Sequence, residues 1–143
     1  MRRWLVVATI LLVGCLGCGK RAIPVKTTSA SITTSKTTYA AGSPEDALRS
    51  FFDTLRYTDD EGMKKLLAQD VVPRLAERSV ETVAKSLSHT MNEMQRRMDW
   101  RTVGEEGNKA TVFVAPGYQA ACALEGDLWK IRAIFQGTTP VFP

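Results

Sequence analysis

The chain has 143 residues, which is enough for one domain of ordinary size. It carries 19 Lys and Arg against 15 Asp and Glu, but six of the basic residues and none of the acidic ones precede Ser43, so residues 44–143 carry 13 basic and 15 acidic groups. A slightly acidic domain excludes nucleic-acid binding driven by charge, and three cysteines are too few for a disulfide framework.

The first 14 residues have the three parts of an export signal. Arg2 and Arg3 form a positive start, an apolar run extends from Trp4 to Val13, and small residues follow it. The run is shorter than the roughly 20 apolar residues that a membrane-spanning helix needs. The sequence therefore predicts a signal peptide over residues 1–14.

The end of this run, Leu12-Val13-Gly14-Cys15, resembles the lipobox of bacterial lipoproteins. The resemblance implies that Cys15 receives a diacylglyceryl group, that the chain is cut before it, and that acyl chains such as palmitate anchor the mature protein in a membrane. Cys18 after Gly17 offers an alternative, but a cysteine then stands where the lipobox has an aliphatic residue. An ordinary secretory signal that contains cysteines is the remaining alternative.

Residues 15–42 are predicted to form a lipidated N-terminus and a flexible linker. Thr and Ser dominate from residue 27 to residue 38, and such a composition buries too little surface to offset the entropy of ordering. As a coil, the linker would span on the order of 25 to 30 Å. A stalk that carries O-glycans is an alternative on composition alone.

The domain is predicted to begin with helices. Ser43, Pro44 and Asp46 have the spacing of a helix start, and Thr58 with Glu61 predicts the start of a second, shorter helix. Val71-Val72-Pro73 interrupts the helical pattern. A long third helix is then predicted to about Met98, because apolar residues recur every three or four positions: Val80, Val83, Leu87, Met91, Met94 and Met98.

After Asp99 the apolar residues alternate, as they do in strands. Turn residues separate four predicted strands: Trp100 to Val103, Lys109 to Ala115, Tyr118 to Leu124, and Leu128 to Phe135. On the last strand Trp129, Ile131, Ala133 and Phe135 are expected to face one side. The short connections predict an antiparallel meander. The fold class is therefore α+β, with N-terminal helices packed on a curved four-stranded antiparallel sheet and a C-terminal tail at residues 137–143.

Three stretches carry a resemblance to a known family: Ser43 to Leu55, Asp59-Asp60-Glu61-Gly62 and Leu128-Trp129-Lys130-Ile131. They are similar to bacterial lipoproteins with a nuclear transport factor 2-like domain, also described as SnoaL-like or cystatin-like. The resemblance covers about residues 43–136. It implies a cone-shaped domain with a cavity at its open end. Such families include dehydratases, isomerases, hydrolases and domains without known activity, so the fold does not fix the function.

The resemblance directs attention to Asp, His and Tyr as catalytic candidates. His89, the single histidine, is expected at the surface, because it points away from the apolar stripe of its helix. Asp99 beside Trp100 is the weak candidate for a general base, with a turn aspartate as the alternative. Asp59-Asp60-Glu61 is expected to cap a helix rather than to bind a metal ion. No catalytic set and no cofactor or metal site is therefore predicted.

A ligand pocket is the other site that the sequence suggests. Its tentative lining is Met91, Met94, Met98, Trp100 and Tyr118, and the alternative is that these side chains fill the core. Cys122 is expected to be a buried inert thiol, with a disulfide to Cys18 left open.

The expected function is that of a non-enzymatic, lipid-anchored protein of the bacterial cell envelope. Its domain would bind a small apolar ligand or another envelope protein on the extracytoplasmic side. Leu16 after Cys15, in place of an aspartate, favours the outer membrane in a Gram-negative cell. One alternative is a hydrolase or isomerase that uses Asp99. The other is a structural module that forms a homodimer through the outer face of the sheet.

Overall fold

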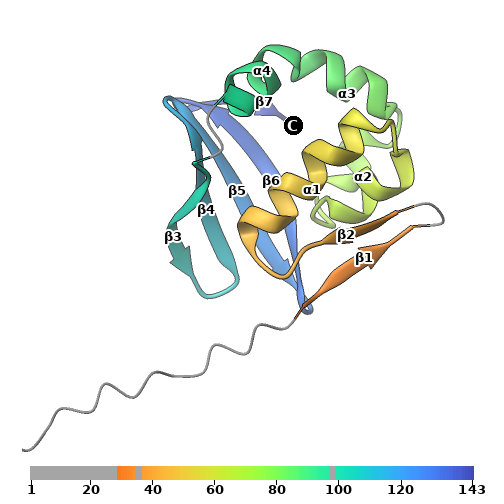
Figure 1. The fold of residues 1–143 in the computed structure, drawn as a ribbon, viewed down its shortest axis with the longest axis horizontal. Helices are drawn as coiled ribbons and strands as arrows, with labels where there is room; N and C mark the ends of the chain where they lie inside the picture. The colour runs from red at the N-terminus through yellow and green to blue at the C-terminus, as the bar shows by residue number, and fades with distance from the viewer. Residues whose placement is uncertain (1–28, 35–36, 97–98) are drawn as a thin grey trace, which may run out of the picture.

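The computed structural model describes residues 29–34, 37–96 and 99–143. The predicted signal peptide and both candidate lipid cysteines lie outside the described residues, as does Met98. The described chain has an α+β fold, in which helices pack on a five-stranded antiparallel sheet and a separate two-stranded hairpin lies beside the helices (Figure 1). Within these residues, none of the helices has the length and apolar character needed to cross a membrane.

Helix α1 (Pro44–Arg56) forms as the sequence predicts. The Ser43 hydroxyl accepts a hydrogen bond from the Asp46 N–H at 3.1 Å, which caps the helix, and Pro44 occupies the first turn, where no N–H partner is needed. The helix lies against three strands of the sheet: β6 (Leu128–Gln136), β4 (Lys109–Ala115) and β3 (Arg101–Glu106). Its buried apolar residues are Ala47, Leu48, Phe51, Phe52 and Leu55.

Helix α2 (Asp60–Leu66) begins one residue later than predicted, because its cap is Asp59 rather than Thr58. Thr58 instead ends α1: its φ is 57°, in the left-handed region, and the next N–H, that of Asp59, bonds the Thr54 carbonyl at 2.9 Å. This is the hydrogen bond of a Schellman motif, in which glycine usually holds the position of Thr58. The corner between the two helices thus carries a strained β-branched residue.

The prediction of one long third helix is wrong. The structure has two helices there, α3 (Val80–Ser86) and α4 (Ser88–Arg96), and a short 3₁₀ helix at Val72–Leu75 precedes them. The Ser86 hydroxyl donates to the Val83 carbonyl at 2.8 Å, a back-bond that bends helices. Leu87, at the break, is completely buried. The predicted stripe is therefore a core face up to Leu87, but it does not lie on one continuous helix.

The sheet has five strands in sequence order rather than the predicted four. The strands β3 (Arg101–Glu106), β4 (Lys109–Ala115), β5 (Tyr118–Glu125) and β6 (Leu128–Gln136) follow the predicted meander. The fifth, β7 (Thr139–Phe142), replaces most of the predicted tail and buries Phe142.

A β-bulge at Arg132 corrects the predicted inner face of β6. Cys122 pairs with Ile131 while Ala121 pairs with Ala133, so Arg132 is an extra residue in its strand. The bulge moves the inward position from Ala133 to Ile134, which is fully buried. Ala133 and Phe135, expected in the core with Trp129 and Ile131, are only partly buried and face outward.

The second half of the predicted linker is folded. Strands β1 (Ser31–Thr33) and β2 (Thr38–Ala40) pair as an antiparallel hairpin, which lies along α1 and α2 in Figure 1. Ile32 and Tyr39 are 5% and 4% exposed. The prediction of a coil-like linker is wrong for these residues because tertiary contacts to the helices supply the buried surface that the segment lacks by itself.

Candidate functional site

Asp99 has no enclosed site around it. Its side chain is 79% exposed, and its carboxylate lies 4.0 Å from the Arg101 guanidinium, which in turn covers the Phe113 ring at 5.3 Å from the ring centre. A general base needs a desolvated position within reach of a bound substrate. The structure gives Asp99 the geometry of a surface aspartate.

The residues of the tentative pocket pack into or against the core. Tyr118 is 5% exposed, Met91 and Trp100 are partly buried against the core, and the Trp100 ring lies 5.7 Å from the Phe52 ring. The side chain of Met94 lies outside the described residues, as does Met98. Tyr118 also borders a small hollow of about 80 Å³ with Phe113 and Gln119, which Met91 and Trp100 do not line. In the part of the chain that is described, the indole Nε1 of Trp100 is buried without a hydrogen-bond partner.

His89 and Cys122 lie where the sequence analysis expects them. His89 is exposed. Cys122 is a free, buried thiol, and burial raises its pKa to about 12, so it is not a thiolate at neutral pH. Among the residues that the structure describes, no three His, Cys, Asp or Glu side chains lie close enough together to hold a metal ion.

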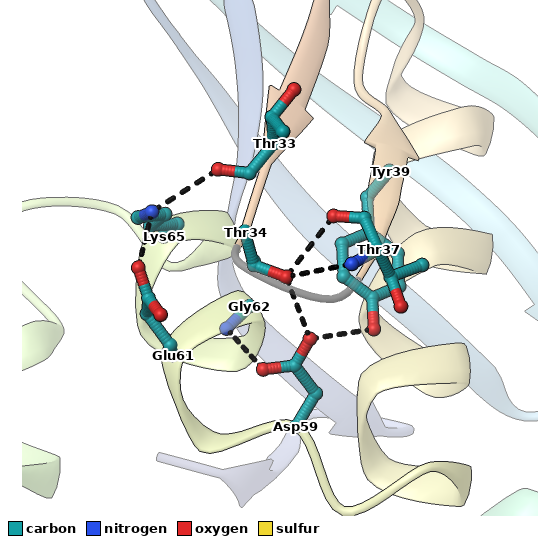
Figure 2. Close-up of polar contacts among 8 residues, drawn as sticks. All are labelled: Thr33, Thr34, Thr37, Tyr39, Asp59, Glu61, Gly62 and Lys65. Carbon is teal, nitrogen blue, oxygen red and sulfur yellow. Dashed lines mark hydrogen bonds and ion pairs between the residues drawn. The ribbon is translucent and has the colours of Figure 1, made fainter.

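A cluster of hydrogen bonds surrounds Asp59, where the N-terminal hairpin meets α2 (Figure 2). One carboxylate oxygen, Oδ1, accepts the N–H of Gly62 at 2.9 Å and thereby caps the helix. The other, Oδ2, accepts the phenol of Tyr39 at 2.9 Å and lies 3.2 Å from the hydroxyl of Thr34. We call Thr34, Tyr39, Asp59 and Gly62 the hairpin joint.

Gly62 makes room for this arrangement. A Cβ at position 62 would lie 2.7 Å from Tyr39 Cε2 and 2.8 Å from Asp59 Oδ2, closer than side chains tolerate. Glycine inside a helix ordinarily lowers stability relative to alanine by roughly 0.5–1 kcal/mol. Its presence in the first turn of α2 is explained by the close packing of the Tyr39 ring.

The electrostatics of the joint keep the phenol protonated. Burial and the hydrogen bond to the Asp59 carboxylate both raise the pKa of Tyr39 above its usual value. Tyr39 is therefore a donor at all physiological pH values, and Asp59 is its acceptor. A protonated Asp59 would lose this acceptor role on the oxygen that carries the proton.

A lysine holds the other strand of the hairpin. Lys65 Nζ donates to the Thr33 carbonyl at 3.1 Å and to Glu61 Oε1 at 2.5 Å, so a side chain of α2 is hydrogen-bonded to the end of β1 (Figure 2). Lys130 on β6 donates to the carbonyl of Lys65, and burial lowers the pKa of Lys130. The hairpin, α2 and the sheet are thus connected through polar contacts as well as through the core.

A second polar connection joins α1 to the edge strand β3. Glu45 Oε1 accepts both the N–H and the hydroxyl of Thr102 at 2.6 Å. Burial raises the pKa of the Glu45 carboxyl, but the hydrogen bonds from Thr102, the backbone and Ser43 outweigh it, so the pKa lies below its usual value.

Thr34, Tyr39 and Gly62 were missed as site residues by the sequence analysis. Two signals were present: a lone aromatic residue in a Thr/Ser tract, and a glycine three residues after a helix-capping aspartate. Neither signal identifies the other member of the contact, because the two segments are 20 residues apart and meet only in the fold.

Comparisons with protein families, with curated proteins and with solved structures give no match for this chain.

Proposed function

We propose that the protein is a lipid-anchored protein of the bacterial cell envelope, attached through Cys15, and that its domain is a non-enzymatic binding module for another envelope protein. The observation that carries the anchor is the order Arg2-Arg3, apolar run, Leu12-Val13-Gly14-Cys15 at the start of the chain. The orientation is extracytoplasmic, and Leu16 favours the outer membrane of a Gram-negative cell.

The geometry of the domain supports a binding rather than a catalytic role. The one carboxylate with a catalytic rationale, Asp99, is exposed, and the described part of Tyr118, Trp100 and Met91 packs into the core. One described hollow, between α2 and α3, is open and lined largely by polar side chains such as Asp60, Lys64 and Glu77, so we favour a protein partner over a small apolar molecule.

The fold that we propose for the domain is a nuclear transport factor 2-like cone. Helices on one face of an antiparallel meander are consistent with it (Figure 1). Bulges interrupt the pairing between every two neighbouring strands of the sheet, and bulges bend strands and increase twist. Such bending is what a sheet needs in order to wrap round a helix.

Substitution of the two leader cysteines tests the anchor. In a bacterial host that processes lipoproteins, Cys15→Ala should move the protein from the detergent-extracted membrane fraction to the soluble extracytoplasmic fraction, or leave it as uncleaved precursor. Cys18→Ala is the matched control and should leave the protein in the membrane fraction. The reverse result would assign the lipid to Cys18. Membrane association that survives both single substitutions and the double one would contradict the proposal.

A second candidate function is a structural module that forms a homodimer through the outer face of the sheet. The observation in its favour is a group of small or apolar residues, only partly buried, among the outward positions of β4, β5 and β6: Phe113, Ala121, Ala123, Ala133 and Phe135. Exposed apolar faces of this kind mark interaction sites.

Light scattering after size exclusion tests this candidate. The dimer hypothesis predicts twice the mass of one chain at micromolar concentration and a single-chain mass for Phe135→Glu, because a charge at the centre of an apolar interface is left unpaired. Asn92→Asp, at an exposed position of α4 away from the outer face of the sheet, controls for added negative charge. A wild-type protein that is monomeric at high concentration would eliminate the candidate.

A further inference from the structure

Residues 29–40 have the composition of a linker, and those of them that the structure describes, 29–34 and 37–40, form a docked hairpin. Their strands are only three residues long each. A two-stranded hairpin of any length is marginal in water without a surface to pack on. The hairpin therefore owes its order to its contacts with the helices.

These contacts are few and concentrated. The apolar part is Ile32 and Tyr39, which belong to the core cluster. The polar part is the hairpin joint at Asp59, the Lys65 contact with the Thr33 carbonyl, and a hydrogen bond of 2.6 Å from the Ser50 hydroxyl to the Ala40 carbonyl. A short unit that adds only two side chains to the core can open with a free energy below that of the whole domain.

The structure also indicates where separation of the hairpin from the helices would stop. Ala41 is completely buried, and its carbonyl accepts the Trp129 N–H at 2.9 Å, which fixes it to the first residues of β6. The Ala41 N–H bonds the Ala30 carbonyl at 3.0 Å, so the chain enters the hairpin beside the place where it leaves. A pull on the chain before residue 30 acts on this bond first and then on the strand pairs Ser31 with Ala40 and Ile32 with Tyr39, one after another.

We propose that the β1–β2 hairpin is a stored length of tether, docked on the helices through Tyr39 and Asp59 and released as a unit when the chain is pulled from its N-terminal side. Release leaves the core of α1, α2 and the sheet folded and adds residues 29–40 to the linker. Twelve further residues span about 20 Å as a coil and about 40 Å when fully extended. The role of the hairpin as stored tether rests on the proposed lipid anchor. The equilibrium between the docked and the released hairpin does not depend on that anchor.

Hydrogen exchange of the full-length protein in detergent tests the proposal. The amides of Ile32 and Tyr39 should exchange at least about 100-fold faster than those of the central strands β5 and β6, because they open by the local route. Tyr39→Phe removes the phenol that binds Asp59 and should accelerate hairpin exchange about tenfold, with exchange in β5 and β6 unchanged. Tyr57→Phe is the matched control, since Tyr57 is 65% exposed and lies outside the joint, and it should change neither.

Asp59→Asn separates the joint from the helix cap. Asparagine caps helices as well as aspartate does, so α2 should retain its protection while hairpin exchange rises. The proposal is overturned if the hairpin and the central strands exchange at one common rate, or if both variants accelerate all amides in parallel. Failure of the lipid anchor would show separately, as an unlipidated chain whose hairpin still exchanges by its own faster route.

Discussion

Among the described residues other than glycine, Thr58 is the one with a positive φ. A β-branched residue in the left-handed region is strained, and here the conformation is imposed by the Schellman hydrogen bond that ends α1. Thr58→Gly should raise the free energy of unfolding by about 1 kcal/mol, the typical cost of this conformation for an L-residue. Denaturant unfolding measures the change. Thr58→Ala should fall between the two, and an equal stability of all three variants would contradict the strain.

At position 62 we expect glycine to give a more stable protein than alanine, the reverse of their usual order inside a helix. Gly62→Ala should destabilise the protein by about 1–3 kcal/mol, because the new Cβ forces the Tyr39 ring or the Asp59 carboxylate to move. Gly104→Ala is the control, since a Cβ there meets nothing within 4 Å, and it should be neutral or stabilising. Thermal unfolding of both variants distinguishes the two positions. A stabilising Gly62→Ala would mean that the hairpin does not pack closely on α2.

At the scale of elements, the contact between α1 and β3 makes stability depend on pH. The folded-state pKa of Glu45 lies below its unfolded value, so its contribution is fully present above the unfolded value and is lost as the pH falls through the folded one. Glu45→Gln should therefore reduce the free energy of unfolding by about 1–2 kcal/mol at pH 7. Denaturant unfolding at neutral pH and at about pH 3 compares the two proteins. A difference that persists unchanged at low pH would show that the charge of Glu45 is not responsible.

Elements whose signals are local could be predicted from the sequence. The cap at Ser43, the proline after it and the apolar face up to Leu55 specify α1 without help from the rest of the chain. The glycine-containing turns likewise separate β4, β5 and β6 close to the predicted positions, whereas β3, predicted to end at Val103, continues to Glu106. Residues of α3 were also identified as core residues by their spacing, although a side-chain hydrogen bond at Ser86 breaks the helix that the spacing predicts.

Elements that depend on distant contacts could not be predicted. The hairpin β1–β2 has a linker composition and is ordered by Asp59 and Lys65, which lie 20 or more residues away. The bulge at Arg132 has no turn residue to mark it, yet it changes which side of β6 faces the core. The hairpin joint could not be predicted for the same reason. Asp99 and Trp100 are neighbours in the sequence, whereas Tyr39 and Asp59 come into contact only in the folded chain.

At the scale of the whole molecule, we propose that the anchor, the linker, the hairpin and the domain each have a role, in this order from the membrane outward. A lipid on Cys15 would hold the chain, the Thr/Ser segment would space it, and the hairpin would be released as further linker when the chain is pulled. The described part of the α+β domain has one buried apolar core, and Phe113 and Phe135 lie partly buried on the outer face of its sheet. Its activity is therefore expected to depend on where it is held and on what it contacts there.

Mass spectrometry of the N-terminal tryptic peptide tests the central claim most directly. The protein is purified from the membrane fraction of a host that processes lipoproteins, and trypsin should release a peptide that begins at Cys15 and ends at Lys20. We expect this peptide to carry the mass of a diacylglyceryl group on Cys15, with Cys18 unmodified. A mature chain whose first peptide contains two unmodified cysteines would contradict the lipid anchor, and with it the account of the protein as a tethered envelope module.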